Sequence, residues 1–312
     1  MQYTVPVIRS FQKATSESAP HRVRACVAGP KTKAKAMFER KLDWRCEQLP
    51  PTALLLVGTC DYLFALFQSA ATWKLRSLLT ISFAMAVVCS KRCASEEAGE
   101  VPESWNVIQP AGTAVDLSSL PTREVKGNGR RRVCLKSTPT VYKPDRAHYC
   151  RQLGRVVLKF DHFSLWHNNA IGFYNHKFFF LFTFYGSLTA SLSALMAWLS
   201  LTKSSTTSDL VVVGILTAIA LGMLCVFGLH AFLVCRNQTF KELLKKSSSD
   251  AVAQPEDGLN PYDCGLVANL KEEFGSKFGV EWFLPVRTSH KGDGLSFDRW
   301  EDRPERSTLV PL

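Results

Sequence analysis

Long apolar windows alternate with polar, basic segments along this chain. The windows from Phe178 to Leu201 and from Leu210 to Val234 contain no Asp, Glu, Lys or Arg. Each is longer than the roughly 20 residues that a helix needs to cross a bilayer core. Two earlier windows, from Thr52 to Thr72 and from Leu75 to Ser90, are apolar except for one acidic and one basic residue. The pattern predicts four transmembrane helices.

The segments outside these windows are long and basic. Residues 1–51, 91–177 and 235–312 hold 10, 14 and 11 of the 38 Lys and Arg residues. An even number of spans puts all three segments on one side of the membrane, and the positive-inside rule makes that side the cytosol. We therefore expect a multi-pass membrane protein with both termini in the cytosol. The pattern does not distinguish the Golgi, the endoplasmic reticulum and the plasma membrane.

Composition and charge narrow the class of protein. Hydrophobic residues make up 46% of the chain and charged residues 21%, which excludes a disordered protein. The net charge of +11 is explained by membrane topology and by attraction to anionic lipid, so we expect a lipid bilayer as partner and no nucleic acid. The 10 Cys residues include no Cys-x-x-Cys pair.

A motif-rich string fills the end of the central loop and the start of the third window, at residues 134–179. Its most informative pieces are Lys143-Pro144-Asp145-Arg146-Ala147-His148, Cys150, Val157-Leu158-Lys159, Asp161-His162, Trp166, Asn168-Asn169, Gly172, Asn175 and Lys177-Phe178-Phe179. In residues and spacing the string resembles the cysteine-rich domain of the DHHC protein S-acyltransferases, the palmitoyltransferases. Two later stretches are similar to further motifs of that family: Asn237 to Glu242, and Asn260 to Gly275.

The resemblance implies an architecture and an activity. The architecture is a bundle of four transmembrane helices, with a loop-rich cytosolic domain between the second and third, at 134–177, and a C-terminal motif at 260–275. The bundle would enclose a cavity for a fatty acyl chain. The activity is transfer of a palmitoyl group from palmitoyl-CoA, through a cysteine of the enzyme, to cysteines of client membrane proteins.

The chain departs from the family at the attacking residue. Where the family has Asp-His-His-Cys, this chain has Asp161, His162, Phe163 and Ser164. A serine hydroxyl needs a general base, and His162 oriented by Asp161 is the proper kind of base. One interpretation is that Ser164 carries the acyl group as an oxyester. The alternative is a catalytically inactive pseudoenzyme that acts as a membrane scaffold or partner subunit, in which the Asp161–His162 pair only holds the loop.

The metal ligands that the resemblance implies are also replaced. The family binds two structural zinc ions with Cys3His sets, and sites of this kind contribute folding free energy. Among the eight aligned ligand positions, only Cys150 still has a zinc-binding side chain, and most of the residues at the other positions are apolar or aromatic. We therefore expect a packed core without metal, and we expect no other cofactor. The positions are Lys136, Pro139, Tyr149 and Val156 for the first set, and Cys150, Leu153, Phe163 and Ala170 for the second.

Other candidate residues surround this site. Lys143, Arg146 and Lys159 are candidates for the phosphates of CoA, because Lys and Arg commonly bind such anions. Plain solvation or lipid contact is the alternative for each of them. By resemblance, Trp166, Asn168 and Asn169 frame the opening of the acyl cavity. Interfacial packing of the tryptophan and capping by the two amides are the alternatives.

Residues at the spans complete the list. Asp61 is costly in a bilayer, so we expect it to face the bundle or a polar cavity. Cys89 and Cys93 lie at the cytosolic end of the second span, where they are either sites for S-acylation of the protein itself or inert thiols. By resemblance, Asn269 hydrogen-bonds to the backbone of the cytosolic loops and ties the C-terminal segment to the central domain.

Overall fold

The computed structural model describes residues 49–67, 72–105, 107–108, 122–126, 129–137, 140–202, 205–245, 260–288 and 292–302. All of these belong to one compact unit that starts at Glu47. The basic N-terminal region expected at residues 1–51 lies almost entirely outside the described residues, as does Pro139.

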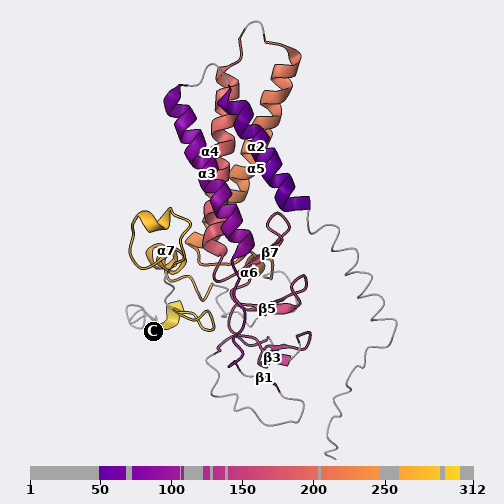
Figure 1. Cartoon of the computed structure of the whole chain (residues 1–312). Coiled ribbons are helices and arrows are strands. Elements are labelled where there is room, and N and C mark those ends of the chain that lie inside the picture. Colours follow the sequence, from indigo (N-terminus) through magenta and orange to yellow (C-terminus); the bar gives the residue numbers. More distant parts are fainter. Residues whose placement is uncertain are drawn as a thin grey trace, which may run out of the picture. The chain divides into compact units, whose positions relative to one another are not determined.

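Four long helices pack against one another in this unit (Figure 1). They are α2 (Leu49–Leu66), α3 (Trp73–Ser95), α4 (His176–Leu199) and α5 (Thr207–Cys235). Helix α4 contacts the other three, so it forms the centre of the bundle. Within the described residues, α3, α4 and α5 are long and apolar enough to cross a membrane.

The helix boundaries differ from the apolar windows around Thr72. We expected the first window to continue to Thr72 and a short connection at residues 73–74, but α2 ends at Leu66 and α3 already begins at Trp73. Thr72 is the N-cap of α3, because its hydroxyl accepts a hydrogen bond from the backbone N–H of Leu75 at 3.4 Å. Thr72 therefore marks the start of α3, although hydropathy alone assigns it to the first apolar window.

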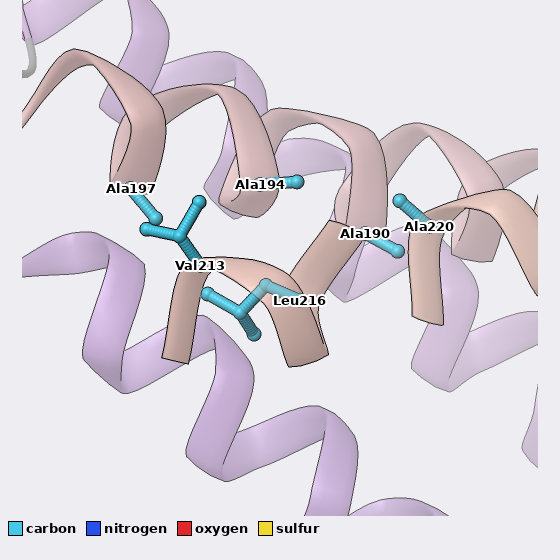
Figure 2. Close-up of a cluster of buried hydrophobic side chains, with 6 residues drawn as sticks. All are labelled: Ala190, Ala194, Ala197, Val213, Leu216 and Ala220. Atoms are coloured by element: carbon cyan, nitrogen blue, oxygen red, sulfur yellow. The ribbon is translucent and has the colours of Figure 1, made fainter. Parts of the chain in front are cut away.

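Small residues bring α4 and α5 close together. Ala190, Ala194 and Ala197 of α4 face Val213 and Leu216 of α5, with Ala220 completing the cluster (Figure 2). Small side chains let two helix backbones approach closely, which is how helices gain packing energy in a lipid environment where apolar burial gives little. Helix α5 begins with a capping box formed by Thr206 and Asp209.

Short antiparallel strands occupy the segment between α3 and α4. Strands β1 (Val107–Ile108), β3 (Thr140–Tyr142) and β2 (Val133–Cys134) form a sheet in that order. Two hairpins follow. Strand β4 (His148–Cys150) pairs with β5 (Arg155–Val157), and β6 (His162–Ser164) pairs with β7 (Asn169–Ile171), with Ser164 opposite Asn169. The predicted loop-rich domain therefore contains small strand pairs within its loops.

The C-terminal segment folds back onto the bundle. It contains α6 (Phe240–Lys245), α7 (Leu266–Phe274) and the short 3-10 helices η2 (Val280–Trp282) and η3 (Trp300–Asp302). Helix α7 packs against α5 and α4. The Asn269 amide donates to the carbonyl oxygen of Cys235 at 2.8 Å and accepts from the N–H of Cys264 at 3.0 Å. The expected backbone hydrogen bonds of Asn269 are present, but they tie this segment to the end of α5 and not to the central domain.

Candidate functional site

Ser164, at the position of the family's cysteine, is paired with a histidine that the sequence did not single out. Its Oγ lies 2.9 Å from Nδ1 of His167, and both side chains are buried. Ser164 ends β6, and the turn 165–168 brings His167 back beside it. Asn168 in that turn has a left-handed φ of 47°, a conformation that asparagine tolerates better than most residues.

Asp161 and His162 form a second pair. Oδ2 of Asp161 lies 2.7 Å from Nδ1 of His162, and Oδ1 accepts the N–H of Phe240 at 2.6 Å. Burial alone would raise the pKa of Asp161, but the hydrogen bond with His162 and the nearby imidazoles outweigh burial and lower it to about 2. Asp161 is therefore an ionised carboxylate held between two elements that are 79 residues apart in sequence.

Further imidazoles lie around this carboxylate. Nε2 of His176 is 3.9 Å from Oδ1 of Asp161, and the ring of His230 lies 5.7 Å from that of His162 between centroids. In the described parts of the chain, Asp161, His162 and His230 are the one group whose ligand atoms lie close enough together to hold a metal ion, within 4.8 Å. Two of these atoms are already joined by the 2.7 Å hydrogen bond, so the arrangement works as a polar network without an ion.

The environment of His167 differs from that of His162. Burial, and secondarily the neighbouring His162, lower the pKa of His167 to about 4. The imidazole is therefore neutral at pH 7 and can accept a proton. The His167 ring meets Phe182 edge-on, with 4.8 Å between centroids.

A cavity of about 330 Å³ opens between the helices next to this turn. Trp166 reaches it from the turn, and Phe182, the ring that His167 contacts, forms part of its wall. The end of the cavity near Trp166 is thus close to the Ser164–His167 pair. Asp61 also lines the cavity, so the expectation that it faces the bundle or a polar cavity is confirmed. The other lining residues are Gly58, Phe83, Ala86, Val87, Ser90, Lys91, Ala94, Gly186, Thr189, Ala190, Ile219 and Met223.

Asn169 joins the hairpin to the end of α3. Its amide nitrogen donates to the carbonyl oxygens of Cys93 at 3.0 Å and Glu96 at 2.8 Å. The last carbonyls of a helix have no partner within the helix, so this amide satisfies them. Asn175, which we did not assign to the site, donates to the carbonyl of Ala170 at 2.8 Å and reinforces the same junction. Asn168 is exposed, and no hydrogen bond of its side chain connects it to this junction.

Two of the three candidate phosphate ligands lie in buried ion pairs. The Arg146 side chain is fully buried and donates to Glu242 at 2.8 Å and to Asn237 at 2.8 Å. Lys159 donates to Glu272 at 2.8 Å. Burial alone would lower the pKa of both groups, but the neighbouring carboxylates raise it. These contacts satisfy the two cations inside the protein, which speaks against a role in holding CoA phosphates.

Lys143 is half-buried, and burial together with the nearby Arg132 lowers its pKa. Its assignment to CoA phosphates stays a prediction.

Six of the eight positions of the family's zinc ligands lie in two apolar clusters. Cys150 and Ala170 are buried with Ala98, Val157 and Phe160, and Leu153 and Phe163 pack against them. All four positions of the second set are therefore in one cluster. Burial raises the pKa of the Cys150 thiol, which disfavours the thiolate form that binds metal.

The first set of positions is only partly brought together. Val156 is buried with Cys134, Ala147, Leu158 and Phe173, and Tyr149 packs against this second cluster. Lys136 is exposed. The described positions of the first set therefore offer no group of ligands to a metal ion.

Of the two alternatives for Cys89 and Cys93, S-acylation and inert thiols, the structure favours inert thiols. Both side chains are completely buried in the structure. Cys93 packs against Ile171, Phe178 and Phe179, because the strand domain covers this end of α3. A buried thiol is not accessible to S-acylation.

Sequence reasoning missed His167, His176 and His230. A signal was present for two of them. His167 follows Ser164 by three residues, and a tight hairpin turn brings residues at this spacing close together. His230 is the one titratable side chain apart from Cys225 in the window from Leu210 to Val234.

Comparison with known proteins agrees with this geometry. The family described as DHHC palmitoyltransferase matches residues 128–247. The chain is 33% identical over 187 residues to "Palmitoyltransferase ZDHHC15" of Xenopus laevis, covering 57% of this chain and 53% of that protein. It is 30% identical over 198 residues to "Palmitoyltransferase PFA3" of Eremothecium gossypii, an alignment that covers 56% of this chain and 59% of that protein.

A plant relative is covered more fully. The chain is 31% identical over 174 residues to "Probable protein S-acyltransferase 15" of Arabidopsis thaliana, which covers 52% of this chain and 67% of that protein. The other two relatives are matched over little more than half of their length. The motifs, the helices around the cavity and these similarities lead to one conclusion: the chain belongs to the DHHC palmitoyltransferase family.

Proposed function

We propose that the protein crosses the membrane four times, with α2 as the first span and both termini in the cytosol. Helix α2 has 18 residues, close to the length that a bilayer core requires, and packs against α3 and α4. The predominance of Lys and Arg outside the helices supports the cytosolic assignment.

We propose that the protein binds a long-chain fatty acyl-CoA, palmitoyl-CoA by family resemblance, with the acyl chain in the bundle cavity. The observation that carries this proposal is the cavity of about 330 Å³, which Trp166 reaches from the turn that follows Ser164. This volume lies in the range of about 300–1,000 Å³ that is typical of small-molecule sites. Burial of an acyl chain contributes about 0.8 kcal/mol per methylene.

The chemistry that follows binding is acyl transfer at Ser164. Asp161 and His162, by resemblance the family's acid–base pair, are hydrogen-bonded to each other, and Ser164 is hydrogen-bonded to a neutral imidazole. Transfer to clients through this site is the function that the geometry supports best.

A second candidate is a pseudoenzyme that binds client proteins or an active relative and transfers nothing. It is favoured by the replacement of the attacking thiol and by the burial of Ser164, whose side chain sits under the turn. A Ser164→Cys variant separates the two candidates. If the rest of the machinery works, this variant gains a thioester that neutral hydroxylamine removes. If the site is only a scaffold, the introduced thiol stays unmodified.

We propose that neither family zinc site is kept. The side chains at the described positions are mainly apolar and pack against one another, and the Cys150 thiol has no second ligand in its cluster. Hydrophobic burial replaces the folding free energy that two metal ions would supply.

Acyl-CoA binding is tested by filling the cavity. The purified full-length protein in lipid nanodiscs is crosslinked with a photoreactive palmitoyl-CoA, and the labelled peptides are identified by mass spectrometry. In Gly186→Leu, the new side chain meets the end of the flexible Met223, so it fills the cavity without displacing backbone. We expect saturable labelling of α3 and α4 peptides in the wild type, and a loss of about tenfold or more in this variant.

The matched control is Gly214→Leu, the same substitution in a membrane helix at a position that faces open space. It is expected to label like the wild type. Equal labelling of Gly186→Leu and Gly214→Leu, or an absence of saturable labelling in the wild type, contradicts the proposal.

A further inference from the structure

The Ser164–His167 pair has the geometry of a nucleophile and its base. The 2.9 Å separation of Oγ and Nδ1 is a hydrogen-bond distance, the reach that a general base needs. Both side chains are at least nine-tenths buried, with exposed fractions of 4% and 2%. Water therefore competes little for the serine proton.

Packing, and not a third polar residue, orients the imidazole. Edge-on contacts with Phe182 at 4.8 Å and Phe179 at 5.9 Å hold the ring on two sides. Nε2 of His167 has no hydrogen-bond partner among the described residues. In the tautomer with hydrogen on Nε2, the lone pair of Nδ1 points to the serine hydroxyl, so Ser164 is the donor and His167 the acceptor.

His162 is less suited to this role in the structure. Its Nδ1 is held by Asp161 at 2.7 Å, as in a catalytic triad, but the described contacts of its ring are with Phe179, His230 and Phe240 and include none with Ser164. We expected His162 to serve Ser164, but the hydroxyl is bonded to His167 instead.

We propose that His167 is the general base for Ser164, that the acyl group is carried as an oxyester on Ser164, and that its acceptor is a hydroxyl group and not a thiol. This inference rests on the proposed acyl-CoA binding. It assigns both the base and the chemical class of acceptor.

The first step takes the acyl group from CoA. Oγ of Ser164 bonds to the thioester carbonyl carbon while its proton moves to Nδ1 of His167. The C–S bond then breaks, and the CoA sulfur leaves as a thiol with the proton from His167. In the second step an acceptor hydroxyl gives its proton to His167 and its oxygen to the acyl carbon, and Ser164 leaves with that proton.

The acceptor class follows from the relative energies of the esters. A thioester is a more reactive acyl donor than an oxyester, so transfer from CoA to Ser164 is downhill. Transfer from Ser164 to a cysteine thiol would be uphill, whereas transfer to another hydroxyl exchanges two bonds of the same type. An alcohol is therefore the acceptor that lets the cycle continue.

The test loads the full-length protein with palmitoyl-CoA and follows the Ser164 peptide by mass spectrometry. We expect one palmitoyl group on Ser164, stable to neutral hydroxylamine, removed by alkali and absent in Ser164→Ala. Hydroxyl-bearing and cysteine-bearing peptides of the same sequence are then offered as acceptors. Transfer to the hydroxyl peptide is the expected result, and transfer to the cysteine peptide alone overturns the assigned acceptor.

The variant His167→Asn tests the base. It keeps a polar group of similar size, and we expect its loading rate to fall by about 10²-fold or more while photocrosslinking stays unchanged. Loading in the wild type should be nearly independent of pH from 6 to 8, because the pKa of His167 is about 4. Residual loading in the variant should rise about tenfold per pH unit as hydroxide replaces the base. A purely structural histidine would not produce that change in profile.

Leu165→Ala, at an exposed turn position, is the control and should load normally. Photocrosslinking without an ester on Ser164, or equal loading in His167→Asn, overturns this inference and leaves acyl-CoA binding intact. Loss of photocrosslinking in the wild type instead overturns the proposed function.

Discussion

The two apolar clusters of the strand domain contrast with the polar network around Asp161, which joins that domain to α4, α5 and α6. The clusters contain Cys150 and Val156, at positions where by resemblance the family binds metal, and their side chains are apolar and packed together. The network keeps the ionised Asp161 and surrounds it with His162, His176 and His230. Apolar side chains can fill the space of a metal site. Removing one partner of a buried carboxylate, in contrast, leaves an uncompensated charge in the protein interior.

The largest expected effect comes from the buried cation that joins this domain to the C-terminal segment. Arg146→Ala removes a fully buried guanidinium and leaves the part-buried Glu242 and the amide of Asn237 without it, so we expect a loss of about 3 kcal/mol in the free energy of unfolding. Thermal unfolding of the protein in detergent measures it. Arg155→Ala breaks a more exposed ion pair with Glu100 and should cost less than about 1 kcal/mol. Equal losses would show that Arg146 is not essential to the junction.

A core truncation probes the apolar side of the comparison. Leu158 is 1% exposed and belongs to the cluster around Val156. Leu158→Ala should reduce the free energy of unfolding by about 3 kcal/mol, through lost burial and the cavity left behind. Leu165→Ala, at a position that is 63% exposed, should change it by less than about 0.5 kcal/mol. A small effect of Leu158→Ala would mean that the cluster is loosely packed.

Asp161 provides a pH-dependent contribution. Its pKa is lowered from 3.8 to about 2, so the charged form stabilises the folded state by about 2 kcal/mol at pH 7. This contribution is present above the unfolded pKa and is lost as the pH falls from about 4 towards 2. Thermal unfolding of wild type and Asp161→Asn should differ at pH 7 and converge in acid. Curves that stay parallel over this range would contradict the assignment.

The smallest effect is expected from metal removal. If apolar packing has replaced both zinc sites, a zinc chelator should leave the unfolding midpoint unchanged within about 1 °C, and metal analysis should find less than one zinc per chain. A relative that keeps the family's cysteines, treated in parallel, should lose its cooperative transition because structural zinc contributes folding free energy directly. A chelator-sensitive transition in this protein would refute the replacement.

The sequence predicted the bundle and the apolar replacement better than the polar contacts. Apolar windows of about 20 residues predict helices, because a helix satisfies its backbone hydrogen bonds within the one segment. Leu153, Phe163 and Ala170 were expected in a packed core, and the structure places them in one cluster. The burial of Arg146 could not be foreseen, since its partners Asn237 and Glu242 are 91 and 96 residues away.

In the candidate site, the sequence also failed to predict a contact between residues that are close together in the chain. The sequence pointed to Asp161, His162 and Ser164, but not to the bond between Ser164 and His167. That bond depends on the conformation of the turn, in which Asn168 adopts a positive φ. A family pattern identifies the expected partners, and only the geometry reveals a substitute.

The apolar clusters also bear on where such a protein can work. Oxidants inactivate thiolate metal sites by attacking the sulfur ligands, and a shortage of zinc leaves such sites unfolded. Here the second set of positions holds Leu153, Phe163, Ala170 and a buried Cys150. If apolar packing has replaced both zinc sites, as we propose, this domain keeps its shape through oxidative stress and zinc limitation, conditions that would disable a metal-dependent relative.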